Sequence, residues 1–166
     1  MFEKRDGEIA LPFDPAAGAA DAGLVFIGRI ASPWTRREDC PKNMNAARER
    51  GCGATVEVDP AYRPGLAGLE GASHVVLLTW LGHAPRNLIV QQPRHATAPR
   101  GVFALRSPAR PNPIGLHVAA LMSLDLEAGR MAIDAIDVLD GTAVIDIKPY
   151  YASTDAFPDA VMGRDR

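Results

Sequence analysis

The sequence predicts a mostly β, barrel-like domain with only short helical turns. Short apolar or alternating segments are separated by Pro, Gly and Asp at intervals that suit a closed barrel or a sandwich. No segment has the 3.6-residue period of a long amphipathic helix, and no Gly-x-Gly-x-x-Gly sequence follows a predicted strand. A doubly wound fold of the Rossmann type is therefore disfavoured.

The predicted elements follow one another as short strands. A buried strand begins at Leu24 and ends before Ser32-Pro33, because proline cannot continue a β-ladder. The alternation over residues 54–59 places Val56 and Val58 on one face, as in a half-buried strand. One helical turn is predicted over residues 66–69, and further strands over residues 74–81, 101–105, 117–124, 131–136 and 142–147.

Length and composition favour one soluble domain. The chain has 166 residues, which is long enough for one hydrophobic core and too short for two ordinary domains. Its net charge is −2. Residues 1–22 are rich in Ala, Gly and Pro and predict a loosely attached arm without chemistry, whereas residues 23–162 predict the folded domain. The apolar runs are too short to span a bilayer and the charged start is unlike a secretory signal, so we expect a cytoplasmic protein.

Disulfides and metal sites are not expected. Cys40 and Cys52 are the only cysteines, and they form neither a disulfide framework nor a Cys-x-x-Cys motif. The histidines are spaced by 9, 12 and 22 residues, which matches no zinc motif. They are His74, His83, His95 and His117.

Charge is distributed unevenly along the chain. Residues 71–124 contain five arginines and no acidic residue, whereas the remainder carries 13 basic and 20 acidic side chains. These arginines either pair with carboxylates elsewhere in the fold or line a cleft for phosphate, carboxylate or RNA backbone. They are Arg86, Arg94, Arg100, Arg106 and Arg110.

The segment most informative about function is Arg106-Ser-Pro-Ala-Arg-Pro-Asn-Pro-Ile-Gly115. Its three prolines and one glycine exclude regular structure and stiffen the backbone, so they predict a rigid loop. Such a loop holds Arg106, Arg110 and Asn112 in fixed directions, which is more than a turn between two strands requires.

A second segment predicts a hairpin with a polar face. Asp140-Gly141 is a turn signal between two apolar stretches. On the following strand Asp146, Lys148 and Tyr150 occupy alternate positions, so they share one surface. This surface is either a solvated face with an Asp–Lys pair or a functional face.

These segments resemble the signature of the TsaA-like family, which includes bacterial tRNA methyltransferase O. The resemblance rests on residues 101–115, on Leu139-Asp-Gly-Thr142 and on Asp146-Ile-Lys-Pro-Tyr150. It is supported by Ile27-Gly-Arg-Ile-Ala-Ser-Pro-Trp34, by residues 65–80 and by Phe157-Pro-Asp-Ala160, and so covers residues 24–160.

The resemblance implies a single-sheeted β-barrel, commonly a homodimer, that binds S-adenosyl-L-methionine in a non-Rossmann cleft. It further implies a methyltransferase whose substrate is tRNA and which acts on N6 of threonylcarbamoyl-adenosine beside the anticodon. The chemistry of methyl transfer suggests two catalytic residues: Asn112, which by analogy with the Asn-Pro or Asp-Pro loops of other N6-adenine methyltransferases would orient the amine, and Asp140, which would accept a proton or contact the cofactor. The implied substrate contacts are Arg94, Lys148 and Tyr150. The implied cofactor contacts are Pro41, Lys42, Asn43, Trp80, Leu81, Arg106, Arg110, Pro111, Asn112, Pro113, Ile114, Gly115, Leu116, Asp137, Leu139, Asp140, Gly141 and Thr142.

The sequence also departs from the family pattern. Lys42-Asn43 stands where the family usually has Arg-Gln, and His117 replaces a serine. One alternative is a regulatory protein that binds S-adenosylmethionine without methylating tRNA; His117 and the lack of the larger members' C-terminal region favour it. A plain RNA-binding barrel is a third possibility, disfavoured because aromatic and basic residues are not interleaved as in an RNP motif.

Overall fold

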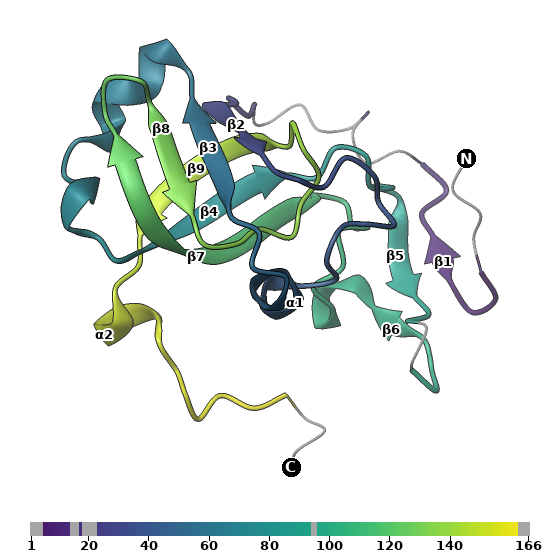
Figure 1. The fold of residues 1–166 in the computed structure, drawn as a ribbon. Coiled ribbons are helices and arrows are strands. Elements are labelled where there is room, and N and C mark those ends of the chain that lie inside the picture. Colours follow the sequence, from purple (N-terminus) through teal and green to yellow (C-terminus); the bar gives the residue numbers. More distant parts are fainter. Residues whose placement is uncertain (1–4, 14–16, 18–22, 94–95, 163–166) are drawn as a thin grey trace.

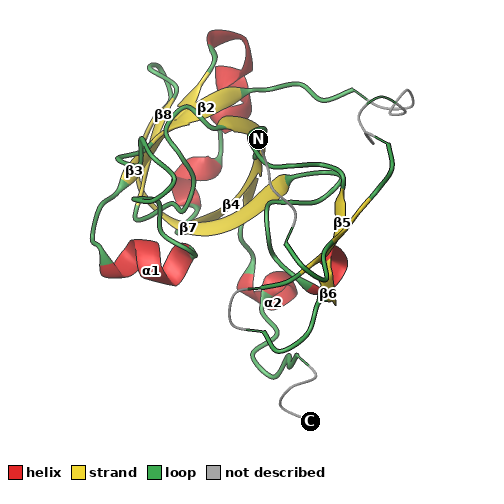
Figure 2. Ribbon diagram, turned by 90° about the vertical axis from the view of Figure 1, so that its right-hand side faces the viewer, coloured by secondary structure: helices red, strands yellow, loops and turns green. Residues whose placement is uncertain are grey.

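The computed structural model describes residues 5–13, 17, 23–93 and 96–162. Its centre is a closed antiparallel barrel of strands in the order β2-β3-β8-β7-β4-β9 (Figure 1). A second sheet, in the order β1-β5-β6, lies beside the barrel and stands apart from it in the perpendicular view of Figure 2. The predicted mostly β, non-Rossmann barrel is confirmed, whereas the small second sheet was not predicted.

All elements are short except β7. The barrel strands are β2 (Gly28–Ala31), β3 (Ala54–Val58), β4 (His74–Trp80), β7 (Ile114–Asp125), β8 (Arg130–Ile133) and β9 (Ala143–Pro149). The small sheet consists of β1 (Ile9–Ala10), β5 (Leu88–Gln91) and β6 (Arg100–Gly101). The helices are α1 (Met44–Glu49), α2 (Ala152–Asp155) and three 3₁₀ helices at Pro60–Leu66, Leu69–Gly71 and Val102–Ala104.

The barrel closes around an apolar core because each strand turns alternate residues inward. On β4, Val75, Leu77 and Thr79 are fully buried, while the residues between them are only partly covered. Strand β2 approaches β3 so closely that a Cβ atom on Gly28 would lie 2.1 Å from the carbonyl oxygen of Glu57. Core side chains from all six strands include Ile30, Val56, Leu77, Ala119, Met131 and Val144.

Four predicted elements are wrong in their limits. The predicted strand over residues 131–136 ends at Ile133, after which the chain leaves the barrel wall. Strand β2 starts at Gly28, because pairing with β3 and β9 starts there, and the preceding residues 24–26 are exposed. The predicted strand over residues 101–105 contains only Gly101, after which the chain turns into a 3₁₀ helix. The predicted helical turn over residues 66–69 is divided between two 3₁₀ helices, because Gly68 between them adopts a φ of 93°.

The described part of the N-terminal arm is attached to the small sheet. Strand β1 pairs with β5, with Ile9 opposite Val90, and the Leu11 amide donates to the carbonyl oxygen of Asn87 at 2.6 Å. Glu8 is only 3% exposed. This attachment is firmer than the loose arm predicted from composition, because two-residue strands and single buried side chains leave no periodic signal in the sequence.

Candidate functional site

The connections at one end of the barrel bring the implied cofactor segments together. Trp80 at the end of β4 pairs with Ile114 and Ala143 at the starts of β7 and β9, and Ala54 at the start of β3 pairs with Ile133 at the end of β8. Residues 41–43, 80–81, 106–116 and 137–142 therefore lie in or next to these connections.

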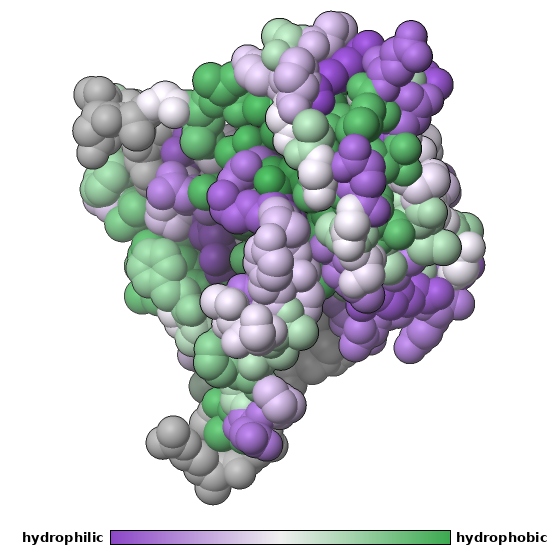
Figure 3. Space-filling view, turned by 90° about the vertical axis from the view of Figure 1, so that its left-hand side faces the viewer, coloured by the Kyte–Doolittle hydropathy of each residue, from purple (hydrophilic) through white to green (hydrophobic). Residues whose placement is uncertain are grey.

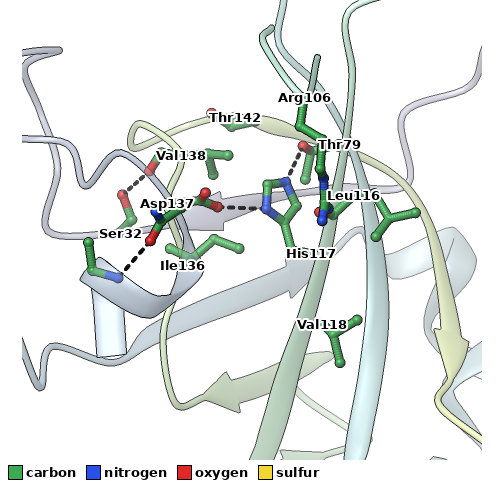
Figure 4. Close-up of polar contacts among 12 residues, drawn as sticks. Ser32, Thr79, Arg106, Leu116, His117, Val118, Ile136, Asp137, Val138 and Thr142 are labelled. Atoms are coloured by element: carbon green, nitrogen blue, oxygen red, sulfur yellow. Dashed lines mark hydrogen bonds and ion pairs between the residues drawn. The ribbon is translucent and has the colours of Figure 1, made fainter. Parts of the chain in front are cut away.

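A chain of polar side chains joins three parts of this end (Figure 4). His117 on β7 places Nδ1 2.7 Å from Oδ1 of Asp137 and Nε2 2.9 Å from Oγ1 of Thr79 on β4. His117 is 5% exposed and Thr79 is fully buried. Because a carboxylate can only accept, Nδ1 donates to Asp137, and the ring orientation is fixed from both sides. The chain ties residues 136–142 to two barrel strands.

Because Gly115 has no side chain, it leaves room for the hydrogen-bonded side chains of Thr79 and His117. A Cβ atom at that position would lie 2.3 Å from Oγ1 of Thr79 and 2.6 Å from Nε2 of His117. Gly115 was implied only as a cofactor contact, and Thr79 was not singled out from the sequence. The sequence feature that indicates this hydrogen-bonded group is His117 in place of the family's serine, because a buried imidazole requires hydrogen-bonding partners.

Residues 136–142 cover the barrel end and are fastened to the chain that follows β2. Ile136 is fully buried, and its carbonyl oxygen accepts from Nε1 of Trp34 at 2.8 Å. Oγ of Ser32 donates to the carbonyl oxygen of Val138 at 2.9 Å. Asp140 is exposed, and its Oδ1 accepts from the Ser32 amide at 3.0 Å. The Asp140 carboxylate thus has a fixed direction while it faces solvent.

Residues 106–113 form the predicted irregular loop, and Arg110 holds it. The Arg110 guanidinium donates to the carbonyl oxygens of Ser107, Val102 and Leu105. These bonds hold the loop together from within. Each one satisfies a backbone carbonyl oxygen that would otherwise need water as its donor. The side chain implied as a cofactor contact is therefore engaged with its own loop.

Arg86 supports the same loop from outside. Its guanidinium carbon lies 5.3 Å from the ring centre of Trp80, and its Nε donates to the carbonyl oxygen of Pro111 at 2.7 Å. A longer contact of 3.5 Å joins Nη2 to Oδ1 of Asn112, which is exposed. Arg106 donates from Nη2 to the carbonyl oxygen of Leu116 at 3.2 Å. Arg86 was counted with the arginines but not assigned to the site.

Neither alternative for the arginines holds for all of them. Within the described residues, no ion pair joins Arg86, Arg100, Arg106 or Arg110 to a carboxylate. Arg86 and Arg110 instead hold backbone carbonyls, a role that the charge pattern alone does not reveal. Arg94 lies outside the described residues.

Residues 40–43 lead into α1 beside Asp137. Pro41 is buried, Lys42 is exposed, and Oδ1 of Asn43 accepts from the Ala46 amide at 2.8 Å as the N-cap of the helix. Burial raises the pKa of the Cys40 thiol, and the nearby Asp137 carboxylate raises it further. Cys40 is therefore a protonated thiol at neutral pH.

Lys148 of β9 and Tyr150, which directly follows that strand, lie away from this end. With Leu116 and Phe157 they border a groove of 610 Å³ between the barrel wall and the C-terminal segment, which projects below the barrel in Figure 3. Nζ of Lys148 lies 2.6 Å from Oδ2 of Asp146, and both side chains are exposed. The solvated Asp–Lys pair is therefore formed, while Lys148 also reaches the groove.

The turn before this strand agrees with its sequence signal. Gly141 adopts a φ of 75°, a conformation that glycine reaches without steric cost. Oγ1 of Thr142 donates to the carbonyl oxygen of Leu139 at 2.6 Å and closes the turn.

Two further properties concern only the part of the chain that the structure describes. Its His, Cys, Asp and Glu side chains form no group of three or more that could hold a metal ion. None of its helices has the length and apolar character needed to cross a membrane.

Comparisons with known proteins identify relatives over most of the chain. Residues 29–156 match the family model of the tRNA-methyltransferase O N-terminal domain. A probable S-adenosyl-L-methionine-binding protein of Methanothermobacter thermautotrophicus is 40% identical over 131 residues, which cover 78% of this chain and 90% of the relative. A tRNA (adenine(37)-N6)-methyltransferase of Mus musculus is 46% identical over 94 residues, which cover 55% of this chain and 21% of the relative.

A crystal structure of TrmO has the same fold. It superposes with a TM-score of 0.71 at 36% identity, and the match covers 86% of this chain and 64% of the TrmO chain. The chain spans less than two thirds of the length of several matched proteins. The extent of the family match and the shared barrel lead to one conclusion: the chain belongs to the family of the tRNA-methyltransferase O N-terminal domain.

Proposed function

We propose that this chain binds S-adenosylmethionine and methylates tRNA at N6 of the threonylcarbamoyl-adenosine beside the anticodon. The observation that carries the proposal is the gathering of the implied cofactor segments at one barrel end, where hydrogen bonds hold residues 106–113 and 136–142. The names of the matched relatives support the same ligand and the same reaction. A tRNA substrate would also be consistent with the cytoplasmic location expected from the sequence.

The side chains at this end suit the groups of the cofactor. Lys42 and Arg106 offer positive charge for the amino-acid carboxylate, and Trp80 and Leu81 offer apolar surface for adenine. When bound, S-adenosylmethionine supplies an electrophilic methyl group on its sulfonium. The protein has to align the acceptor amine and remove one proton.

Two residues carry those tasks in the proposal. Asn112 orients the amine through its exposed carboxamide, on a loop that Arg86 and Arg110 keep rigid. Asp140 takes the proton, because its carboxylate faces solvent in a direction set by the Ser32 amide. Substrate contacts are assigned to Arg94, Lys148 and Tyr150, as the family resemblance implies.

A homodimer is part of the same proposal. The outer groove is bordered by apolar side chains that stay in contact with water, among them Leu116, which is 50% exposed, and Phe157, which is 74% exposed. A second copy that covers this face would remove these apolar side chains from water. Sedimentation equilibrium of the purified chain tests this part; a monomer at all concentrations contradicts it.

Calorimetric titration tests the cofactor and a methylation assay tests the reaction. The chain is titrated with S-adenosylmethionine, S-adenosylhomocysteine and ATP, and is then assayed on threonylcarbamoylated tRNA. Arg106→Ala is expected to weaken cofactor binding on the order of tenfold through a lost charge-assisted contact. Asn112→Ala is expected to keep binding and lose about 100-fold in methylation through lost alignment.

Arg130→Ala is the matched control for both variants. Arg130 stands at the opposite end of the barrel, where it makes only a 3.6 Å exposed ion pair with Glu57. If neither Arg106→Ala nor Asn112→Ala differs from this control, the proposed site is wrong.

A second candidate is a regulatory protein that binds S-adenosylmethionine without methyl transfer. The favouring observation is that a relative of which the match covers 90% is named a probable S-adenosyl-L-methionine-binding protein, whereas the match covers only 21% of the mouse methyltransferase. Cofactor binding with no methylation of any tRNA would support this candidate over the first.

A further inference from the structure

A cationic cavity of 490 Å³ lies beside the rigid loop, between the small sheet and the chain that follows β2. Three arginines from distant parts of the sequence line it: Arg5 of the arm, Arg37 after β2, and Arg106 of the loop. Gln91 and Ser107 add polar groups to the same lining. Nothing in the sequence pattern brings Arg5 and Arg37 to this loop.

The charge of this cavity is only partly balanced. Arg5 pairs with Glu8 at 2.8 Å, whereas Arg37 and Arg106 have no ion pair within the described residues. The neighbouring Arg36, by contrast, is paired with Glu38 and Asp39. Two unpaired guanidinium groups that face one cavity repel each other, and an anion between them removes that repulsion.

Glu8 holds Arg5 in place at the rim. Its side chain is fully buried, and its carboxylate accepts from the Arg5 amide at 3.0 Å, from the Gln92 amide at 3.1 Å and from the Arg5 guanidinium. Burial opposes ionisation of this carboxyl, but the two amides and Arg5 together hold its pKa below the ordinary value. A carboxylate so well satisfied positions Arg5 and is not itself a ligand-binding group.

The walls of the cavity suit a nucleotide. Prolines 85, 93 and 108 give flat apolar surfaces on which a ribose or a base can pack. Planar guanidinium groups that approach from different directions match the oxygens of a phosphate. Arg106 lines this cavity and also donates to the carbonyl oxygen of Leu116, so the side chain connects the cavity lining to β7 at the proposed cofactor end.

We propose that Arg5 and Arg37, which line this cavity beside the cofactor-binding Arg106, bind a backbone phosphate of the RNA substrate and fix the position of the target base relative to the cofactor. The proposal rests on the proposed function and adds to it a phosphate subsite. Arg5 and Glu8 precede residue 29, where the family match begins, so the subsite uses residues that the family model does not contain.

RNA binding tests the subsite without relying on methylation. A 17-nucleotide anticodon stem-loop RNA is titrated by fluorescence anisotropy over a series of KCl concentrations, with wild type, Arg5→Ala and Arg37→Ala. Each variant is expected to lose on the order of tenfold in affinity, as for a lost hydrogen bond to a charged group. Each should also lower the slope of log K against log[KCl] by about 0.7 to 0.9, which corresponds to one phosphate contact.

Two further variants separate the subsite from folding and from general charge. Glu8→Gln releases Arg5 without removing it, so it should weaken RNA binding as Arg5→Ala does, and the double variant should lose no more than Arg5→Ala alone. Arg29→Ala removes an arginine that pairs with Glu57 on the barrel wall, and it should leave both affinity and slope unchanged.

Calorimetry with S-adenosylmethionine and with inorganic phosphate distinguishes the remaining outcomes. Unchanged cofactor affinity in Arg5→Ala and Arg37→Ala supports the subsite, whereas an equal loss of cofactor affinity assigns the cavity to the cofactor and overturns it. Inorganic phosphate that binds more tightly than the RNA, and is lost in both variants, makes the ligand a free anion and also overturns it. If the wild-type protein binds the cofactor but no RNA, the phosphate subsite is wrong and the proposed cofactor site stands. If it binds RNA through the cavity but no cofactor, the proposed function is wrong and the phosphate subsite stands.

Discussion

Two hydrogen-bonded carboxylates of this molecule, Asp137 and Glu8, differ in what they hold. Asp137 lies inside the barrel end and ties residues 136–142 to β7 through His117, whose other nitrogen meets β4. Glu8 lies where the arm meets the small sheet, and it holds only Arg5 and the Gln92 amide. The first belongs to the closed barrel and the second to an attached segment, so losing the first should weaken the whole fold and losing the second only a local structure.

The largest effect is expected from Gly115→Ala. Its Cβ atom would lie 2.3 Å from Oγ1 of Thr79 inside a closed barrel, so β4 and β7 must separate or the His117 chain must break. We expect a loss of about 3 kcal/mol in the free energy of unfolding, as for an overpacked core, measured by urea denaturation. The control is Gly65→Ala, where the added atom meets nothing within 4 Å; equal losses in both would show that the His117 chain is not rigid.

A smaller but still global effect is expected from Asp137→Ala. The change leaves Nδ1 of His117 without its acceptor in a buried position, which costs about 2 kcal/mol, and it frees residues 136–142 so that cofactor affinity falls. The matched control on the outer face is Asp146→Ala, which removes an exposed pair with Lys148 and a local hydrogen bond from the Ile147 amide and should cost less than about 1 kcal/mol. If Asp146→Ala lowers the free energy of unfolding as much as Asp137→Ala does, the buried carboxylate is no more important for the fold than the exposed one.

The Glu8 cluster should respond to pH locally. Hydrogen bonds hold the folded pKa of Glu8 below that of an unfolded glutamate, so its contribution is complete above the unfolded value of about 4.3 and is lost as the pH falls through the lower folded pKa. Hydrogen exchange should show protection of the β1 and β5 amides declining below that range while β4 and β7 stay protected. Protection that declines equally in both sheets would mean that Glu8 supports the whole fold.

The smallest effect is a change in thiol reactivity. Burial and the Asp137 carboxylate raise the pKa of Cys40, so Cys40 should react more slowly with a thiol-disulfide reagent than the exposed Cys52 at pH 8. Asp137→Asn removes the charge and should speed Cys40 severalfold while Cys52 is unaffected. Each rate is measured in a variant whose other cysteine is replaced by serine; an unchanged Cys40 rate would show that Asp137 exerts no field on it.

The sequence by itself determined the local parts of this protein. The alternation over β3, the continuous apolar run of β4, the Asp140-Gly141 turn and the stiff proline loop follow from neighbouring residues, because side-chain pattern and backbone restriction act over a few positions. The family resemblance likewise rests on short motifs, and its barrel is confirmed.

The tertiary structure decided which distant residues became partners. Thr79, His117 and Asp137 meet because the register of β4 against β7 and the path of residues 134–142 bring them together. The Arg110 guanidinium donates to carbonyl oxygens of its own loop. Arg5 lines the same cavity as Arg106 and is held by the buried Glu8. Side-chain partnership across tens of residues depends on barrel closure, and no local period in the sequence encodes it.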